Sequence, residues 1–327
     1  MNVHSKNISL VTEIFLLGFQ NLQNLRTFFF LLLLLIYCAT ICGNLLIIVV
    51  VSSSRSLHSP MYFFLTQLSF SDILLTTTIV PNMLHVMLHE GSSMSFVGCL
   101  IQFYLFIATE ALECLLLTVM SYDRYQAICN PLHYTSIIDI PFCVKFIFLI
   151  WLIIFFMILM FSITMSQYQF CGPNTIDHFF CDLDPTLQLS CSDTSLVKIE
   201  SMIQVIPIVL CPFTVIIVSY VYIIFTILKI PSVTGRQKTF STCSSHLAVV
   251  CIYYGTIICI YLFPNTEGIK KILSLFYTVV TPILNPIIYS LSNRDIKQAF
   301  RKLMNKAHST FQINLLKGLS PLAIKYR

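Results

Sequence analysis

The sequence predicts an all-α membrane protein, a bundle of seven transmembrane helices followed by a short amphipathic eighth helix. The composition is 57% hydrophobic and 10% charged, with a mean hydropathy of +0.84, and a water-soluble domain could not bury that much apolar surface. Seven stretches carry almost no formal charge, and each exceeds the roughly 20 residues that a helix needs to cross a bilayer core. They are Thr27–Ser54, Ser56–His89, Gly91–Tyr122, Phe146–Ile176, Ser201–Leu228, Thr239–Thr266 and Ile272–Asn293.

The basic residues predict the orientation of the bundle in the plasma membrane. Five of the 19 Lys and Arg residues fall on the side of the N-terminus and the other 14 on the opposite side. The positive-inside rule therefore places the N-terminus outside the cell and the C-terminus in the cytoplasm. Residues 1–25 would be an extracellular segment, 26–292 the bundle, and 293–327 a cytoplasmic amphipathic helix and tail. The first span would act as the insertion signal, because Met1–Leu25 is largely polar.

The helices are expected at intervals set by the apolar stretches, with short connections except before the fifth span. That connection, about Met165–Val197, is long enough to form an ordered lid over the outer end of the bundle. After the seventh span, basic and apolar residues alternate, as in a helix lying on an anionic membrane surface. The expected transmembrane helices are 26–51, 60–88, 97–129, 141–164, 198–229, 237–263 and 271–291.

Modification sites gather on the predicted outer side. Asn7-Ile8-Ser9 is a glycosylation sequon there, and four of the 13 cysteines also fall on this oxidising side. Four cysteines allow three pairings, and the sequence does not choose among them. A zinc site competes with disulfides, but no paired His and Cys spacing supports it, so no metal is assigned. The four cysteines are Cys99, Cys171, Cys181 and Cys191.

Several short motifs recur at the ends of the predicted spans. The most specific is Met120–Cys129, which contains Asp123-Arg124-Tyr125 at the inner end of the third span. An acid beside an Arg at the membrane boundary can pair in one state and separate in another. The accompanying motifs are Gly43-Asn44, Leu57–Leu65, Leu68–Asp72, Lys238–Leu247 and Pro282–Ser290.

Together these motifs resemble those of the odorant receptors, within the rhodopsin-like superfamily of G-protein-coupled receptors. The resemblance runs from about Asn7 to Lys302, and the Ser95–Cys99 entry to the third span looks like the tetrapod-type, class II branch. It implies a bundle activated by a small, mostly apolar odorant, and coupling to an olfactory-type stimulatory G protein that raises cyclic AMP. It also implies the disulfides Cys99–Cys181 and Cys171–Cys191.

The polar residues within the spans match an interior cluster of that family. Polar groups at membrane depth are costly and usually functional. Two carboxylates in one dry space need a cation, a proton or nearby amides to coexist. One interpretation is a sodium ion at Asp72 and Glu113, and the other is a protonated, hydrogen-bonded structural network. The cluster consists of Asn44, Asp72, Glu113 and Asn285.

A second group of residues is expected to carry the activation switch. The Arg124 side chain would pair with Asp123 in the inactive state and meet the G protein after activation. His246 is either a state-dependent hydrogen-bond partner or a satisfied interior histidine. The proline after Asn285 would kink the last span by freeing a backbone carbonyl. The predicted switch residues are Asp123, Arg124, Tyr125, Tyr220, Lys238, His246, Asn285, Pro286 and Tyr289.

The ligand site is expected on the face of the third span that shares a helical register with Asp123. Its lining would be mainly apolar and aromatic with a few polar anchors, as in small-molecule sites, although a plain bundle core has a similar composition. The only Trp, Trp151, is interpreted as a packing residue. The predicted ligand contacts are Phe103, Phe106, Ile107, Glu110, Gln204, Val205, Ile208, Tyr254, Ile257, Ile258, Tyr261, Leu275 and Thr278.

Glu110 departs from the family pattern, which has a small or hydroxyl residue there. Its carboxylate could bind an amine, or donate a hydrogen bond to a carbonyl if protonated. The alternative is an acid coupled to Glu113 or to water that tunes basal activity.

Other classes of protein fit the sequence less well. A transporter would show internal symmetry and matched broken helices, which are not evident. An intramembrane enzyme would need a catalytic constellation, and Asp72 with Glu113 could imitate a carboxylate dyad. The surrounding motifs explain these acids better, so no enzymatic activity is expected. A receptor for a metabolite rather than an odorant stays open.

Overall fold

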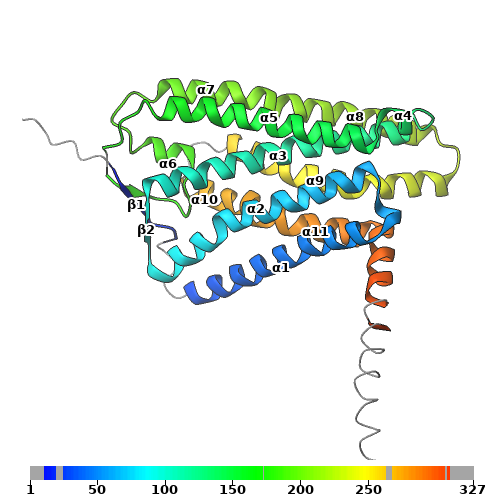
Figure 1. Cartoon of the computed structure of the whole chain (residues 1–327), viewed down its shortest axis with the longest axis horizontal. Coiled ribbons are helices and arrows are strands. Elements are labelled where there is room, and N and C mark those ends of the chain that lie inside the picture. The colour runs from blue at the N-terminus through cyan, green and yellow to red at the C-terminus, as the bar shows by residue number, and fades with distance from the viewer. Residues whose placement is uncertain (1–10, 20–24, 172, 263–266, 306–307, 310–327) are drawn as a thin grey trace, which may run out of the picture.

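The computed structural model describes residues 11–19, 25–171, 173–262, 267–305 and 308–309. Long helices run side by side along one axis (Figure 1). Within these ranges, six helical segments are long and apolar enough to cross a membrane, and a shorter apolar segment, Cys243–Cys259, lies within a seventh long helix. The seven segments agree with the predicted spans to within a few residues. The expected bundle of seven membrane helices is confirmed.

The helices pack in a closed arrangement around the third span. Helix α1 packs on α2 and α11, α2 packs on α3, and α3 also contacts α5, α8 and α9. Helix α3 has 34 residues and lies at the centre of the bundle, where most of its residues between Leu112 and Asp123 are buried. The bounds are α1 Arg26–Ser53, α2 Pro60–His89, α3 Phe96–Cys129, α5 Ile140–Met165, α7 Ser195–Val205, α8 Cys211–Lys229, α9 Val233–Leu262, α10 Glu267–Leu275 and α11 Thr281–Ser292.

The fifth and seventh spans each contain a π-helical turn that the sequence pattern does not reveal. Segment η2, Ile206–Leu210, joins α7 to α8, and η3, Phe276–Val280, joins α10 to α11. A proline lies within or just after each turn, at Pro207 and Pro282, and lacks the N–H that a regular α-helix needs. Such π turns are often found at functional sites, because they re-aim the side chains around them.

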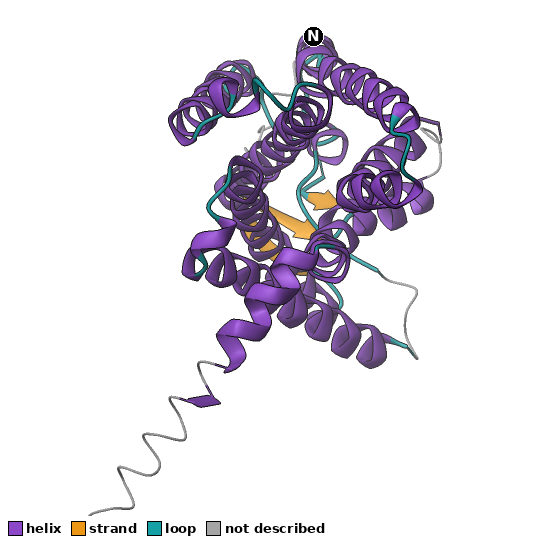
Figure 2. Cartoon of the chain, turned by 90° about the vertical axis from the view of Figure 1, so that its right-hand side faces the viewer, coloured by secondary structure: helices purple, strands orange, loops and turns teal. Residues whose placement is uncertain are grey.

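A small β-sheet is an addition to the predicted all-α fold. Strand β1, Glu13–Leu16, pairs antiparallel with β2, Ser92–Ser95, and parallel with β3, Thr175–Ile176. The sheet lies at one end of the bundle, and Figure 2 shows its strands behind the ring of helices. We call residues 11–19, strand β2 and the loop 166–194 the lid, and that end of the bundle the lid end. The long loop is ordered here, as expected.

The lid has an apolar core of its own. Ile14 and Leu16 of β1 are fully buried against Ile176, Phe179 and Phe180. The short helix α6, Leu183–Leu187, continues the lid, and the Asp182 side chain accepts a hydrogen bond from its first backbone N–H. Burial of these side chains accounts for the order of a segment that has little regular structure.

The opposite end carries the short elements that connect the spans. The turn η1, Arg55–Leu57, lies between α1 and α2, and α4, Tyr134–Ile137, lies between α3 and α5. After α11 the chain turns sharply, and residues 294–305 form a helix whose Ile296 and Ala299 are buried (Figure 1). Residues 294–305 are thus helical, while an amphipathic eighth helix on a membrane surface stays a prediction.

Candidate functional site

A buried polar cluster lies at the middle of the bundle. Asn285 of α11 donates from Nδ2 to both carboxylate oxygens of Asp72 at 3.0 Å, and to Oε1 of Glu113 at 3.5 Å. All three side chains are at most 2% exposed. One amide therefore contacts both acids, so the structure brings these three predicted residues together. The Asn285 Oδ1 atom, also buried, has no hydrogen-bond partner among the described residues.

Asn44, the fourth polar residue, supplies a hydrogen-bond donor that α11 lacks at Pro286. Pro286 has no N–H, so the carbonyl of Pro282 four residues earlier lacks its helical donor. Asn44 Nδ2 donates to that carbonyl at 3.1 Å. The close approach needs the neighbouring Gly43, where an added Cβ would lie 3.1 Å from the Pro286 ring. The Gly43-Asn44 and Asn285-Pro286 motifs are thus two halves of one helix contact.

At the end opposite the lid, the predicted Asp123–Arg124 pair is formed. Arg124 donates from Nε to Oδ2 of Asp123 at 2.9 Å and from Nη2 to the same oxygen. The second oxygen, Oδ1, accepts a hydrogen bond from the Tyr134 hydroxyl of α4 at 2.7 Å. Asp123 is fully buried, so both of its oxygens are occupied without water. Tyr125 lies edge-on to Tyr222 of α8.

Tyr220 and His246 connect α8 with α9 at the same level. The Tyr220 hydroxyl lies 2.6 Å from Nδ1 of His246, and the two rings stack at 5.8 Å. The other ring nitrogen of His246, Nε2, is buried and has no hydrogen-bond partner among the described residues. His246 is therefore bonded at one nitrogen in this state. Tyr289 is fully buried, and its hydroxyl also has no partner in the described part of the chain.

The predicted ligand residues of α3 lie beneath the lid. Phe106 contacts the Phe180 ring of the lid at 5.1 Å and the Tyr277 ring of η3 at 5.7 Å. Phe103 packs on Phe161 of α5 at 5.6 Å. Both α3 rings are buried, whereas Ile107 is half-buried and packs against the same cluster.

Glu110 is the polar group at the base of this aromatic set. The Tyr253 hydroxyl lies 3.1 Å from Oε2 of Glu110, 3.1 Å from the Glu110 carbonyl and 3.0 Å from Sγ of Cys114. Tyr253 is buried, so α9 contacts α3 here through a hydrogen-bonded hydroxyl. The other carboxylate oxygen, Oε1, is buried with no partner among the described residues. An unpaired buried acceptor is costly, so this oxygen is suited to a donor from a ligand.

The remaining predicted ligand residues differ in their surroundings. Tyr254 is buried and stacks on Phe213 of α8 at 4.6 Å, and its hydroxyl has no partner in the described chain. Ile258, one turn farther along α9, is 44% exposed, unlike Tyr254. Thr278 is fully buried and bonds the carbonyl of Ser274. The half-buried members are Gln204, Val205, Ile208, Ile257 and Leu275.

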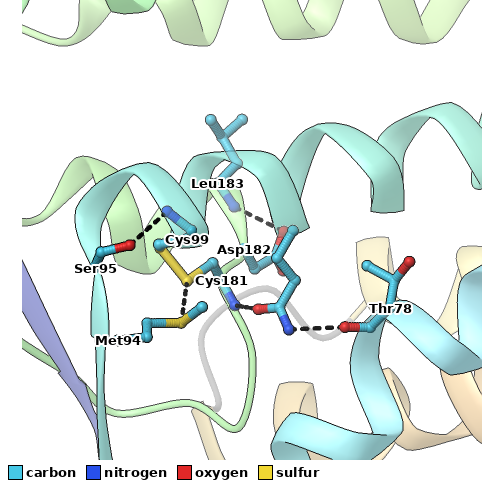
Figure 3. The surroundings of a disulfide bond; sticks show 9 residues. Thr78, Met94, Ser95, Cys99, Cys181, Asp182 and Leu183 are labelled. Carbon is cyan, nitrogen blue, oxygen red and sulfur yellow. Dashed lines mark hydrogen bonds between the residues drawn. A yellow bond between two sulfur atoms is a disulfide. The ribbon is translucent and has the colours of Figure 1, made fainter.

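Both disulfides that the resemblance implies are formed: Cys99–Cys181 attaches the lid to α3, and Cys171–Cys191 closes a loop within the lid. Around the first, Gln102 bridges the lid and α2. Its Oε1 accepts from the Cys181 N–H and its Nε2 donates to the Thr78 carbonyl, both at 3.0 Å (Figure 3). The aromatic residues next to Cys181 are thereby held over the α3 face.

Ion pairs join the lid to the ends of the spans. Lys271 of α10 lies 2.5 Å from Asp177 and donates to the Gly18 carbonyl at 3.2 Å. The adjacent His178 is buried between aromatic rings, and burial, followed by the charge of Lys271, lowers its pKa to about 3. Burial raises the pKa of Asp182, in the same loop, to about 6. Burial therefore lowers the pKa of His178 and raises the pKa of Asp182 within the same lid.

The side chains at three predicted positions are outside the described part of the structure. Asn7 lies outside the described residues. Lys238 and Tyr261 lie within α9, but their side chains are not described. No group of three or more His, Cys, Asp or Glu residues close enough to hold a metal ion occurs in the ranges that the structure describes.

Several site residues were not predicted from the sequence. Tyr134 and Tyr253 reach Asp123 and Glu110 from other elements, and no local pattern marks those contacts. His178 and Phe180 could have been suspected, because they lie within three residues before Cys181, a cysteine that the predicted disulfide ties to α3.

Comparison with known proteins gives a consistent picture. A family model described as "Olfactory receptor" matches residues 33–307. The chain is 47% identical to olfactory receptor 11L1 of Homo sapiens over 304 residues, which is 92% of this chain and 94% of that protein. It is 45% identical to olfactory receptor 10C1 of Homo sapiens over 92% of this chain and 98% of that protein. It is 46% identical to olfactory receptor 1468 of Rattus norvegicus over 78% and 82%, respectively.

Proposed function

The chain belongs to the olfactory receptor family, and on that premise we propose that it binds a small, mostly apolar odorant within the bundle and activates a stimulatory G protein that raises cyclic AMP. Odorant sensing through G-protein signalling is the function of the family, and the chain is a multi-pass membrane receptor, not an enzyme. The ligand class and the kind of G protein are the parts proposed here.

One helix carries the observation on which this proposal depends. Helix α3 bears the disulfide to the lid at Cys99, the acid Glu110 with its unpartnered Oε1, the polar-cluster acid Glu113 and the Asp123–Arg124 pair. At about 1.5 Å per residue, a 34-residue helix spans about 50 Å, enough to reach from one membrane face to the other. Ligand and G protein can each favour one position of this helix, and each then strengthens binding of the other.

We expect the odorant to carry one hydrogen-bond donor, an amine or a hydroxyl, on an apolar body. The donor would bind Oε1 of Glu110, and the body would lie against Phe106 and Tyr254. A hydrogen bond to a charged group contributes about 1.5–3 kcal/mol, which corresponds to about 10- to 100-fold in affinity.

A cyclic AMP reporter in cells that express the olfactory G protein tests the proposal. A panel of small amines, alcohols, ketones and alkanes first identifies an activating odorant. Glu110→Gln should then raise the half-maximal concentration of a donor-bearing odorant about 10- to 100-fold and leave a matched donor-free odorant unchanged. Tyr253→Phe is the matched control, because it removes the neighbouring hydroxyl but keeps the acid.

Two results would count against it. An unchanged response of Glu110→Gln across the whole panel would remove the ligand assignment and favour a role of Glu110 in basal activity. A wild-type response that survives Arg124→Ala unchanged would remove the signalling assignment.

The same proposal places the N-terminus and the lid outside the cell. The basic residues support it, since those of the 294–302 segment and of Arg55 lie at the end opposite the lid. Segment 1–25, with a glycan on Asn7, would then be extracellular, and 293–327 cytoplasmic. Antibodies against tags at the two termini of intact cells test this, and only the N-terminal tag should be stained.

The polar cluster is also suited to a sodium ion. Asp72 and Glu113 supply carboxylate oxygens, and the unpartnered Oδ1 atoms of Asn44 and Asn285 are buried amide acceptors nearby in the same contact network. A sodium ion there would offset the repulsion between the acids. Replacing sodium with choline should shift the odorant dose response of the wild type but not of Asp72→Asn. Equal responses of the wild type in both salts would favour the protonated network.

A further inference from the structure

His85 and His89 form a pair of imidazoles on the last two turns of α2, at the lid end. They are four residues apart, so they share one face of the helix. Their ring centroids are 4.3 Å apart, and both residues are exposed. Neither residue belongs to the polar cluster, the switch or the predicted ligand site.

The hydrogen bonding of His89 fixes which of its nitrogens is free. Nδ1 lies 3.0 Å from the carbonyl oxygen of His85. A carbonyl can only accept, so Nδ1 carries the proton and Nε2 keeps its lone pair. This arrangement, in which one ring nitrogen is held by a carbonyl and the other is free, is the one that orients histidines as metal ligands.

From this geometry we propose that His85 and His89 bind a divalent transition-metal ion, Zn²⁺, Ni²⁺ or Cu²⁺, at the end of α2. Two histidines at this helical spacing are a known zinc-ligand arrangement, and imidazole nitrogen suits all three ions. Water would complete the coordination shell, since the pair is exposed.

The surrounding charges do not oppose the ion. Arg26 and Glu90 are the charged groups in contact with this end of α2. Arg26 donates to the carbonyls of Met87 and Leu88 and lies 2.5 Å from Glu90, so the pair adds no net charge. A bound ion would join the last two turns of α2, directly before the Glu90-Gly91 turn into β2, and would stiffen the attachment of the lid.

Retention of the purified full-length receptor on a Ni²⁺-charged resin tests the site. The protein should carry no histidine tag, and its free cysteines should be alkylated, since thiols also bind these ions. Wild-type protein should need at least about 10-fold more imidazole for elution than His85→Ala or His89→Ala, by analogy with the loss of a ligand-supporting contact. His58→Ala with His133→Ala, two exposed histidines far from the pair, should elute like the wild type.

A rearranged variant separates a metal site from histidine content. His85→Leu combined with Leu88→His keeps both the number of histidines and the composition, but adjacent residues do not share a helix face. This variant should elute at about the same imidazole concentration as His85→Ala and His89→Ala. If the rearranged variant needs as much imidazole for elution as the wild type, the proposal is wrong. Equal retention of His85→Ala and the wild type would also overturn it.

Hydrogen exchange gives an independent measurement. Zn²⁺ should slow exchange of the backbone amides of residues 85–91 in the wild type and not in the rearranged variant. Slowing of the same size in both proteins would place the ion elsewhere and contradict the proposal.

Discussion

The Tyr134 hydroxyl donates to Oδ1 of Asp123 at 2.7 Å, on the oxygen that Arg124 leaves free. A side chain from the connection between α3 and α5 therefore completes the Asp123–Arg124 pair. Because Asp123 is fully buried, each of its hydrogen bonds helps to keep Arg124 in the closed position.

Removing this hydroxyl should raise basal signalling. Tyr134→Phe deletes a hydrogen bond to a buried carboxylate, which is worth about 1.5–3 kcal/mol to the state described here. We expect ligand-free cyclic AMP to rise several-fold at equal surface expression. Tyr122→Phe is a matched control, because the Tyr122 hydroxyl only accepts from Gln126 on the same helix. Equal basal signals in Tyr134→Phe and wild type would show that the contact does not hold the switch.

Tyr289 should act in the opposite direction. Its buried hydroxyl has no partner among the described residues, so this state carries the cost of an unpaired polar group, about 1–3 kcal/mol. A conformation in which the Tyr289 hydroxyl forms a hydrogen bond is stabilised by that free energy relative to this state. Tyr289→Phe removes this stabilisation. We expect weaker odorant potency, by about 5- to 100-fold, with lower basal signalling. Tyr37→Phe, at a 3.4 Å surface contact with Thr77, should change neither. Increased basal activity of Tyr289→Phe would contradict this assignment.

The two disulfides should differ in their contribution to stability. Cys99–Cys181 closes 82 residues and Cys171–Cys191 closes 20. The chain-entropy estimate gives about 4.5 and about 3 kcal/mol. Replacing Cys99 and Cys181 together with Ser should therefore lower the melting temperature and surface expression more than replacing Cys171 and Cys191. A larger loss for the second pair would mean that local lid structure, rather than attachment to α3, limits stability.

The lid should lose stability in mild acid through His178. Burial and Lys271 lower its folded-state pKa to about 3, below the ordinary value of 6.5, and Asp177 is the neighbouring acid. The unfolded chain therefore binds a proton that the folded lid rejects, and stability falls as the pH drops below 6.5. Between pH 6.5 and 5 the loss approaches about 2 kcal/mol. Melting curves of His178→Gln should lack this decrease, whereas exposed His133→Gln should keep it. If the melting temperature falls equally with acid in His178→Gln and in the wild type, another group is responsible for the acid sensitivity.

Asp182 should partly offset that loss. Burial raises its folded-state pKa from 3.8 to about 6, so protonation favours the folded state as the pH falls from about 6 toward 3.8. Asp182→Asn removes this compensation but keeps a side-chain oxygen that can accept from the Leu183 N–H. Its melting temperature should therefore fall more steeply with acid than that of the wild type. A shallower slope would show that the Asp182 carboxylate is not the compensating group.

The amino-acid sequence by itself determined the seven membrane helices, because each apolar stretch must form its backbone hydrogen bonds internally once it is in lipid. It also identified Asp72, Glu113 and Asn285, since polar groups at that depth need partners. Tertiary structure decided which partners they find. The pairing of β1 with β2 and β3, the Tyr253 contact with Glu110 and the Tyr134 contact with Asp123 join segments that lie far apart in the chain. Hydropathy and helical period describe neighbours along one helix, whereas these contacts depend on how the helices and the lid pack together.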